Sequence, residues 1–246
     1  MPCLKRPEFL ALALEKISQT PQANRLDVRL YIDRTDDKRV EEIAYVRDTY
    51  LPTADLFHAN EHITVLSGCW NILNALKAGY DTGAEFIFMI EEDVMIRPSF
   101  FSWNWETHES APYFVTCGRR HGRMPSDFYS NPGTCYRRSS LKQIVSHINS
   151  EYFANNQGYL DKHFPTMIGM DGFLDDGLIR KVQRSIKGRV LCAEPSVAVH
   201  QGFRYYNRLE PHMNKGETIQ ERIQILREIL SHVDPGSRYT HDFEPL

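Results

Sequence analysis

The chain has 246 residues, of which 41% are apolar and 25% are charged, and its formal net charge is −3. These values describe a globular protein whose core needs no disulfides or structural metals, and the small net charge gives no whole-chain electrostatic reason to bind nucleic acid or a membrane surface. The five cysteines are scattered and form no CxxC pair, which indicates free thiols in a reducing compartment. We find no signal peptide and no apolar run near the roughly 18 residues of a membrane span, so we expect a cytoplasmic protein.

Strand-like and helix-like segments alternate along the first half of the chain. Pro7 suits the first turn of a helix, and the apolar residues that follow it repeat at helical spacing. In chain order, the sequence predicts a helix at 7–18, a strand at 27–33, a helix at 37–50, a strand at 62–66, a helix at 70–84 and a strand, buried on both faces, at 86–90. This alternation predicts an α/β fold with a mainly parallel central sheet flanked by helices, the Rossmann-like arrangement.

The second half of the chain has a different character. Two strand-like segments surround a loop rich in glycine, proline and serine, and an amphipathic helix closes the chain. The expected elements are strands at 112–118 and 134–138, a helix at 141–148, a polar linker, a helix at 174–188, a strand-like run at 190–202 and a helix at 217–233.

The most informative stretch is FIFMIEEDVMIRPSFF, residues 86–101. Its apolar strand runs directly into three carboxylates, Glu91, Glu92 and Asp93. In open parallel sheets, ligands bind outside the carboxyl ends of the strands. Crowded carboxylates repel one another, and a divalent cation such as Mn²⁺ or Mg²⁺ would relieve that repulsion. The alternative for three acids alone is a solvated strand end or a helix N-cap.

The flanking residues of this triplet resemble the metal-binding strand of GT-A glycosyltransferases, whose DxD motif holds the metal of a nucleotide-sugar. IEEDVMIRPSFF is especially similar to the N-glycan branching N-acetylglucosaminyltransferases, which carry a Glu-Asp-Asp triplet before a Pro-Phe-Phe-type segment. The resemblance implies that Asp93 contacts the metal directly. It also implies that Glu91 and Glu92 support the ribose or the metal-bound water.

Two earlier stretches resemble the same family. LKRPEFLALALEKI is similar to its first loop and helix, which implies a nucleotide contact from Arg6. YIDRTDD resembles the end of its second strand, where an aspartate commonly hydrogen-bonds the base, which implies that role for Asp33. One departure is that the family's first strand precedes the Arg-Pro pair, whereas five residues precede Arg6 here. We therefore expect this strand to be abbreviated or trimmed.

An acidic pair, Asp175 and Asp176, supplies the candidate general base. The segment from 171 to 202 resembles the acceptor side of the family, including bacterial inverting transferases, in which an acidic pair opens a helix. An inverting transferase must take a proton from the acceptor hydroxyl, and a positioned carboxylate does that. Alignment on the branching enzymes favours Asp175, and alignment on the bacterial enzymes favours Asp176; Asp171 is a third candidate. The alternative is a helix N-terminus whose acids complement the dipole.

His200 ends a strand-like run and is followed by Gln-Gly. In many GT-A enzymes a late histidine completes the metal shell, which implies that His200 joins Asp93 as a metal ligand. Neutral imidazole suits Mn²⁺. An exposed histidine without a ligand role is the alternative.

The resemblance spans about residues 1–205 and implies a nucleotide-binding half, about 1–105, and an acceptor half, about 106–205. Residues 206–246 are expected to form a lid segment and a C-terminal helix. The expected function is metal-dependent, inverting transfer of a hexosyl or N-acetylhexosaminyl group from a nucleoside-diphosphate sugar, with a UDP-sugar favoured. The acceptor hydroxyl could belong to a glycan, a protein or a modified nucleic-acid base.

Two alternatives from other functional classes remain. A sugar nucleotidyltransferase would use a similar sheet, but it normally needs a Gly-rich loop with arginine or lysine after its first strand, which is absent here. A non-catalytic sugar- or partner-binding module could keep the sheet without the chemistry. Metal-dependent donor binding with slow donor hydrolysis would distinguish a transferase from such a module.

Overall fold

The computed structural model describes residues 1–3, 5–58, 67–119, 125, 127–131, 133–172, 174–201 and 216–231. Its strands are β1 (Pro2–Cys3), β2 (Arg29–Ile32), β3 (Asp55–His58), β4 (Phe86–Met89), β5 (Val94–Ile96), β6 (Val115–Cys117), β7 (Thr134–Arg137), β8 (Val190–Cys192) and β9 (Ala198–His200). Its helices are α1 (Pro7–Ser18), α2 (Asp37–Tyr50), α3 (Ser67–Asp81), α4 (Phe100–Ser110), α5 (Arg138–Val145), α6 (Ser150–Ala154), α7 (Asn156–His163), α8 (Asp175–Ser185) and α10 (Ile219–Ser231), with short 3₁₀ turns η1 (Ala23–Arg25) and η2 (Pro165–Met167).

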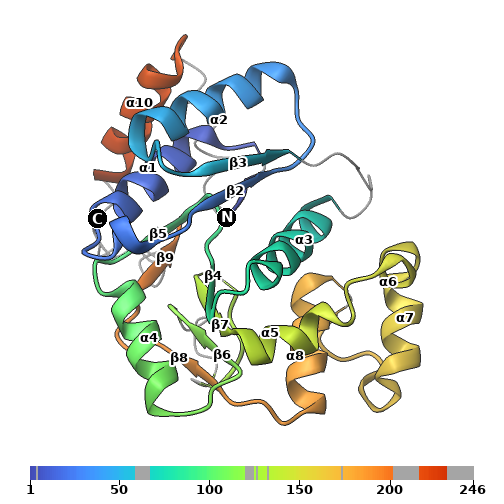
Figure 1. The fold of residues 1–246 in the computed structure, drawn as a ribbon. Coiled ribbons are helices and arrows are strands. Elements are labelled where there is room, and N and C mark those ends of the chain that lie inside the picture. Colours follow the sequence, from blue (N-terminus) through green and yellow to red (C-terminus); the bar gives the residue numbers. More distant parts are fainter. Residues whose placement is uncertain are drawn as a thin grey trace.

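The strands form three sheets within the described residues. β1, β2 and β3 pair in parallel, and β6 and β8 are also parallel. β7 lies antiparallel between β4 and β6, and β5 pairs antiparallel with β9. Figure 1 shows α1, α2 and α10 gathered against the first sheet, and α3, α5 and α8 gathered beside the second. The predicted α/β class, with a parallel sheet flanked by helices, is confirmed.

The core consists of two hydrophobic clusters. The first joins α1, β2, β5 and α10, and the second joins α3, α5, α8 and the strands β6, β7 and β8. The boundary near residue 105 that separates the expected halves falls inside α4. The expected lid falls on residues 206–215, which lie outside the described part of the chain. Among the described helices, none combines the length and apolar character that crossing a bilayer requires.

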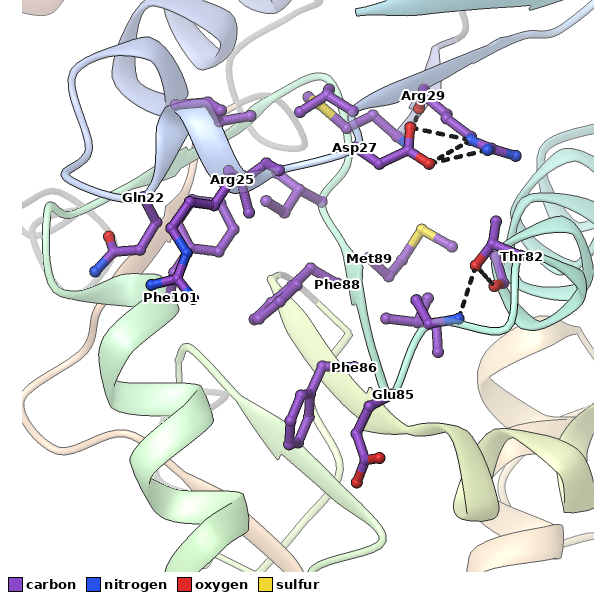
Figure 2. A pocket seen from close by; sticks show the side chains of 18 of the residues that line it. Gln22, Arg25, Asp27, Arg29, Thr82, Glu85, Phe86, Phe88, Met89 and Phe101 are labelled. Atoms are coloured by element: carbon purple, nitrogen blue, oxygen red, sulfur yellow. Dashed lines mark hydrogen bonds and ion pairs between the residues drawn. The ribbon is translucent and has the colours of Figure 1, made fainter.

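One local expectation lies outside the described residues, and two differ from the structure. The second parallel neighbour of β2 is β3, formed by residues 55–58, whereas the expected strand at 62–66 lies outside the described residues. The expected polar linker after α5 contains α6 and α7, each begun by an asparagine side chain that accepts a backbone N–H. β4, expected to be buried on both faces, alternates between half-buried and buried residues, because successive side chains point to opposite faces and the face with Phe86 and Phe88 is less covered (Figure 2).

A buried ion-pair cluster ties α10 to the first two helices. Arg222 is 5% exposed, and its Nε donates to Glu8 Oε1 at 2.6 Å. Its Nη2 lies 2.6 Å from Glu42 Oε1. The buried Arg222 therefore joins α10 to α1 and α2, which lie beside it in Figure 1.

Replacing Arg222 by methionine should destabilise the protein strongly, because it leaves the two buried carboxylates of Glu8 and Glu42 with Arg39 alone to balance them. We expect the free energy of unfolding in urea to fall by about 3–5 kcal/mol. The matched control is Arg227→Met on the same helix, whose pair with Glu15 is about one-third exposed. That control should cost less than about 1 kcal/mol. Equal losses for the two variants would contradict this account.

Candidate functional site

The acidic triplet forms the turn that connects β4 to β5. The turn is closed by a hydrogen bond from Val94 N–H to the Glu91 carbonyl at 3.1 Å. β5 pairs with β9 in a register that sets Val94 opposite His200. The N–H of Gln201 then donates to the Asp93 carbonyl at 2.8 Å. Strand pairing thus brings a histidine from late in the sequence to the acidic turn.

Asp93 is the centre of this site. It has no exposed surface, and its Oδ2 lies 3.2 Å from His200 Nε2 and also accepts a hydrogen bond from Arg6 Nη1. Burial opposes ionisation, but the hydrogen bond to His200 and the charges of His200 and Arg6 outweigh it, so the pKa of Asp93 lies below its ordinary value. Its other oxygen, Oδ1, is buried and has no hydrogen-bond partner among the described residues.

Glu91, Asp93 and His200 form a potential cation site. One ligand atom from each lies within 4.8 Å of the other two. Burial, followed by the charges of Asp93 and of the acidic pair on α8, raises the pKa of Glu91 well above its ordinary value. Two carboxylates and an imidazole suit Mn²⁺ or a similar divalent ion, and the unpartnered Asp93 oxygen is a ready ligand for one. The residues present therefore fit the metal that the sequence implies.

Glu92 has a different role from its two neighbours. It is 1% exposed, and its Oε1 accepts from Arg6 Nε at 2.8 Å and from the Lys5 N–H at 3.4 Å. Glu92 therefore fixes the loop before α1 and holds the Arg6 guanidinium beside Asp93.

Asp33 emerges at the same edge of the sheet as Arg6, because β1 and β2 are parallel neighbours. It is 5% exposed, and its N–H donates to the Cys3 carbonyl at 2.9 Å. Its Oδ1 accepts from the Arg34 N–H at 2.8 Å, which shapes the loop after β2. The structure thus brings Asp33 to the edge where the acidic turn lies.

Asp175 and Asp176 are the first two residues of α8. Asp175 is 8% exposed, and burial together with the charge of Asp176 raises the pKa of Asp175 to about 7. Asp176 is more exposed, with its Oδ2 4.0 Å from Arg180 Nη2. Both acids are close enough to Glu91 to raise its pKa, so the helix terminus faces the acidic turn.

The third acid considered as a base, Asp171, is engaged elsewhere. Its carboxylate lies 2.9 Å from Arg184 Nε, and its backbone has a positive φ of 62°. Asp171 therefore fastens the loop that precedes α8, and nothing in its surroundings favours it as a base.

Three residues that support the site carry no signal in the sequence. Asn131 Nδ2 donates to Glu91 Oε1 at 3.0 Å from a loop that shows only turn residues. Lys181 is 1% exposed, and its Nζ donates to the carbonyls of Met167 and Met170, both at 2.6 Å, which fixes the loop before the acidic pair. A Cβ on Gly177 would lie 2.5 Å from a carbonyl oxygen of that loop, so only glycine fits there. A lysine within a helix normally indicates a solvated face, so the sequence does not predict the buried role of Lys181.

Comparisons with known proteins agree with this architecture. No family model matches the chain, and no curated protein matches its sequence. The mannosyltransferase PcManGT from Pyrobaculum calidifontis, solved with GDP-Man and Mn²⁺, is similar with a TM-score of 0.55 and 13% identity, covering 92% of this chain and 67% of that one. S. aureus TarS 1–349 is similar with a TM-score of 0.51 and 12% identity, covering 96% and 72%.

A cytidylyltransferase from Leptospira borgpetersenii has a TM-score of 0.48 and 10% identity, covering 93% of this chain and 91% of that one. That score is too low to bear on function. The two higher scores show that the chain shares the α/β fold of these two proteins. At these identities the similarity concerns the fold, and the chemistry must be inferred from the site.

The raised pKa of Asp175 predicts a pH-dependent cost to stability. The Asp175 carboxyl holds its proton more tightly in the folded state than in the unfolded chain. Asp175 therefore costs the folded state nothing below about pH 4, and its cost to the free energy of unfolding grows as the pH rises to about 7. Asp175→Asn should therefore stabilise the metal-free protein at pH 8, by up to about 4 kcal/mol, and by less than half as much at pH 5. Urea denaturation at the two pH values measures this. The exposed control Asp48→Asn should show no such difference, and a pH-independent effect of Asp175→Asn would contradict the prediction.

Proposed function

We propose that the chain is a metal-dependent glycosyltransferase that moves a sugar from a nucleoside-diphosphate sugar to an acceptor hydroxyl, with inversion. One observation carries this proposal: the cation site at the end of β4 faces an acidic pair whose first member has a pKa of about 7. The fold shared with a mannosyltransferase that was solved with GDP-Man and Mn²⁺ supports it. A site that only bound a nucleotide would need the cation ligands, but it would not need an acidic pair with a raised pKa.

The metal ligands in this proposal are Asp93, His200 and Glu91. Mn²⁺ or Mg²⁺ held there would offset the charge of the leaving diphosphate. Arg6 already lies beside Asp93 and could donate to the same diphosphate, since a guanidinium pairs well with phosphate oxygens. Asp33, at the adjacent strand end, would contact the base of the nucleotide. Glu92 would act through Arg6 by holding its guanidinium in place.

Asp175 is the proposed general base. As the acceptor oxygen bonds to the anomeric carbon, the bond from that carbon to the diphosphate breaks, and the hydroxyl proton passes to the Asp175 carboxylate. A pKa near 7 suits proton transfer at neutral pH. Asp176 is more exposed and lies near Arg180, so we assign it to orienting the acceptor.

The donor and acceptor are proposed more broadly. The resemblance of the acidic triplet to the branching N-acetylglucosaminyltransferases favours a UDP-sugar carrying a hexosyl or N-acetylhexosaminyl group. The acceptor is a hydroxyl of a glycan, a protein or a modified nucleic-acid base. The five buried, free cysteines favour a reducing, cytoplasmic location. A nucleotidyltransferase is less favoured, because a base for an acceptor hydroxyl has no counterpart in its reaction.

Donor binding should require the metal and Asp93. We expect calorimetry to show binding of UDP or a UDP-sugar in the presence of Mn²⁺, with GDP and its sugars as the second set. Asp93→Asn should weaken this binding at least about 100-fold, because it removes the central anionic ligand. The exposed control Asp48→Asn should bind as the wild type does. Equal binding with and without Mn²⁺, or by the Asp93 variant, would rule out the proposed site.

The assignment of the base predicts a separation between binding and turnover. Asp175→Asn should lower the rate of UDP-sugar hydrolysis or transfer by about 10²–10⁴-fold. Its Mn²⁺-dependent affinity for UDP should stay within about threefold of wild type. Asp176→Asn should lower the rate by less than about tenfold, since it leaves Asp175 in place. The measurement is release of UDP with each variant.

If Asp176→Asn is the more damaging variant, the base assignment is wrong while the transferase proposal survives. If the wild type binds a UDP-sugar with Mn²⁺ and never hydrolyses or transfers it, the chain is a binding module instead.

A further inference from the structure

The loop before α8 exposes a group of apolar side chains. Ile168 is 61% exposed, and Met170 and Leu174 are each 41% exposed. Among the described residues, seven large apolar side chains are exposed, and these three fall within one short loop. Single exposed apolar residues are normal on a protein surface, whereas a group of them marks a place where something binds. We call Ile168, Met170 and Leu174 the apolar rim.

The backbone of this loop, in contrast, is turned toward α8. Lys181 is buried, and its Nζ donates to the carbonyls of Met167 and Met170, both at 2.6 Å. Gly177 packs closely against the Gly172 carbonyl, since a Cβ on Gly177 would lie 2.5 Å from that oxygen. Carbonyl groups of the loop therefore face the helix, and the apolar rim is left on the side that faces water.

The loop holds this arrangement firmly. Gly169, Asp171 and Gly172 all have a positive φ, of 75°, 62° and 72°. A left-handed conformation is uncommon for a residue with a Cβ, and here an ion pair of 2.9 Å between Asp171 and Arg184 Nε fastens it. Because the loop is fixed before anything binds, a ligand on the apolar rim would lose little affinity to ordering it.

The loop runs alongside α8 and ends at the acidic pair. Its contacts with Lys181 involve the second turn of the helix, and its contact with Gly177 involves the first. Leu174 is the N-cap of α8 and directly precedes Asp175. At about 1.5 Å per residue, the stretch of α8 from Lys181 back to Leu174 is about 10 Å long. The apolar rim therefore extends up to about this distance from the proposed general base.

We propose that the apolar rim is an acceptor subsite, and that the acceptor carries an apolar chain or ring next to its reacting hydroxyl. A glycoside with an apolar aglycone has this chemistry: the sugar hydroxyl reaches Asp175 while the aglycone lies on Ile168, Met170 and Leu174. This inference rests on the proposed function, because it takes Asp175 as the base that the acceptor must reach.

The size and place of the apolar rim favour an acceptor over a second copy of the chain. A stable protein interface uses about 20–30 residues on each side, far more than three side chains. A protein that covered Leu174 would also cover the neighbouring Asp175 and keep the acceptor from it. An acceptor, in contrast, has to approach this end of α8 in every turnover.

The test compares two probes that share a sugar and differ in the aglycone, octyl β-D-glucopyranoside and methyl β-D-glucopyranoside. Calorimetry on the full chain, with Mn²⁺ and UDP present and the octyl compound kept below its micelle concentration, measures both affinities. We expect the octyl compound to bind at least about tenfold more tightly, since each buried methylene contributes up to about fourfold.

Replacing all three side chains of the apolar rim by glutamine should remove this preference. The variant Ile168→Gln/Met170→Gln/Leu174→Gln keeps side chains of similar size, and we expect it to bind the two glycosides within about threefold of each other. The matched control is Ile186→Gln at the other end of α8, where the side chain is 46% exposed. The control should keep the full preference. Because all four side chains are exposed, Tm should stay within about 4 °C of wild type in both proteins.

Four outcomes would overturn the inference. Equal binding of the two glycosides by the wild type would show that no apolar subsite exists, and an equal loss in Ile186→Gln would show that it lies elsewhere. A larger fall in Tm for the triple variant would show that the rim supports the fold. A wild-type dimer that the triple variant converts to a monomer, measured by sedimentation, would make a second copy the occupant.

Donor binding separates this inference from the proposed function. If UDP and UDP-sugars do not bind with Mn²⁺ but the octyl preference holds and depends on the apolar rim, the proposed function fails and the rim binds an apolar ligand that is not an acceptor. If the donor binds and the octyl preference is absent, the proposed function survives and the acceptor subsite is wrong.

Discussion

The candidate site depends on the charge of one buried aspartate. Asp93 has no exposed surface, yet its pKa lies below the ordinary value, so it remains ionised without water. A buried carboxylate of this kind is stable only with nearby cations or hydrogen bonds. Arg6 and His200 provide them, and each comes from a segment far from Asp93 in the sequence. The loop before α1, the end of β9 and the turn after β4 must therefore fold together.

The same requirement would let the turn keep its fold when the proposed metal is absent. Arg6 and His200 both contact Asp93 through one oxygen, Oδ2. The other oxygen keeps no partner, and the neighbouring Glu91 has a raised pKa. A divalent cation would satisfy both of these groups at once. The contacts of Asp93 Oδ2 are thus enough for the turn to fold, while Asp93 Oδ1 and Glu91 would still favour the binding of a cation.

Much of the framework could be predicted from the sequence, because its signals are local. The helix at 7–18 follows from its apolar spacing and Pro7, and the structure has it at those residues. The strand before the acidic triplet follows from its apolar run. The predicted proximity of His200 to Asp93 rested on the resemblance to a family, and the β5–β9 register is its physical basis.

The rest could not be predicted, because it depends on contacts between distant segments. Arg222 reads as an ordinary helical cation, and only the packing of α10 on α1 buries it against Glu8. Asn131 reads as a turn residue, and Lys181 as part of a solvated face. β3 carries too short an apolar pattern to be recognised without its parallel partner.

The position of the acidic turn would also set the distance between the proposed metal and the proposed base. Met89 belongs to the second hydrophobic cluster, and Ile90, the next residue, belongs to the first. The turn therefore begins where the two cores meet. Asp93 and its cation partners are held by the first core, whereas Asp175 is held by the second through α8. Any change in how the two cores pack alters the spacing of metal and base.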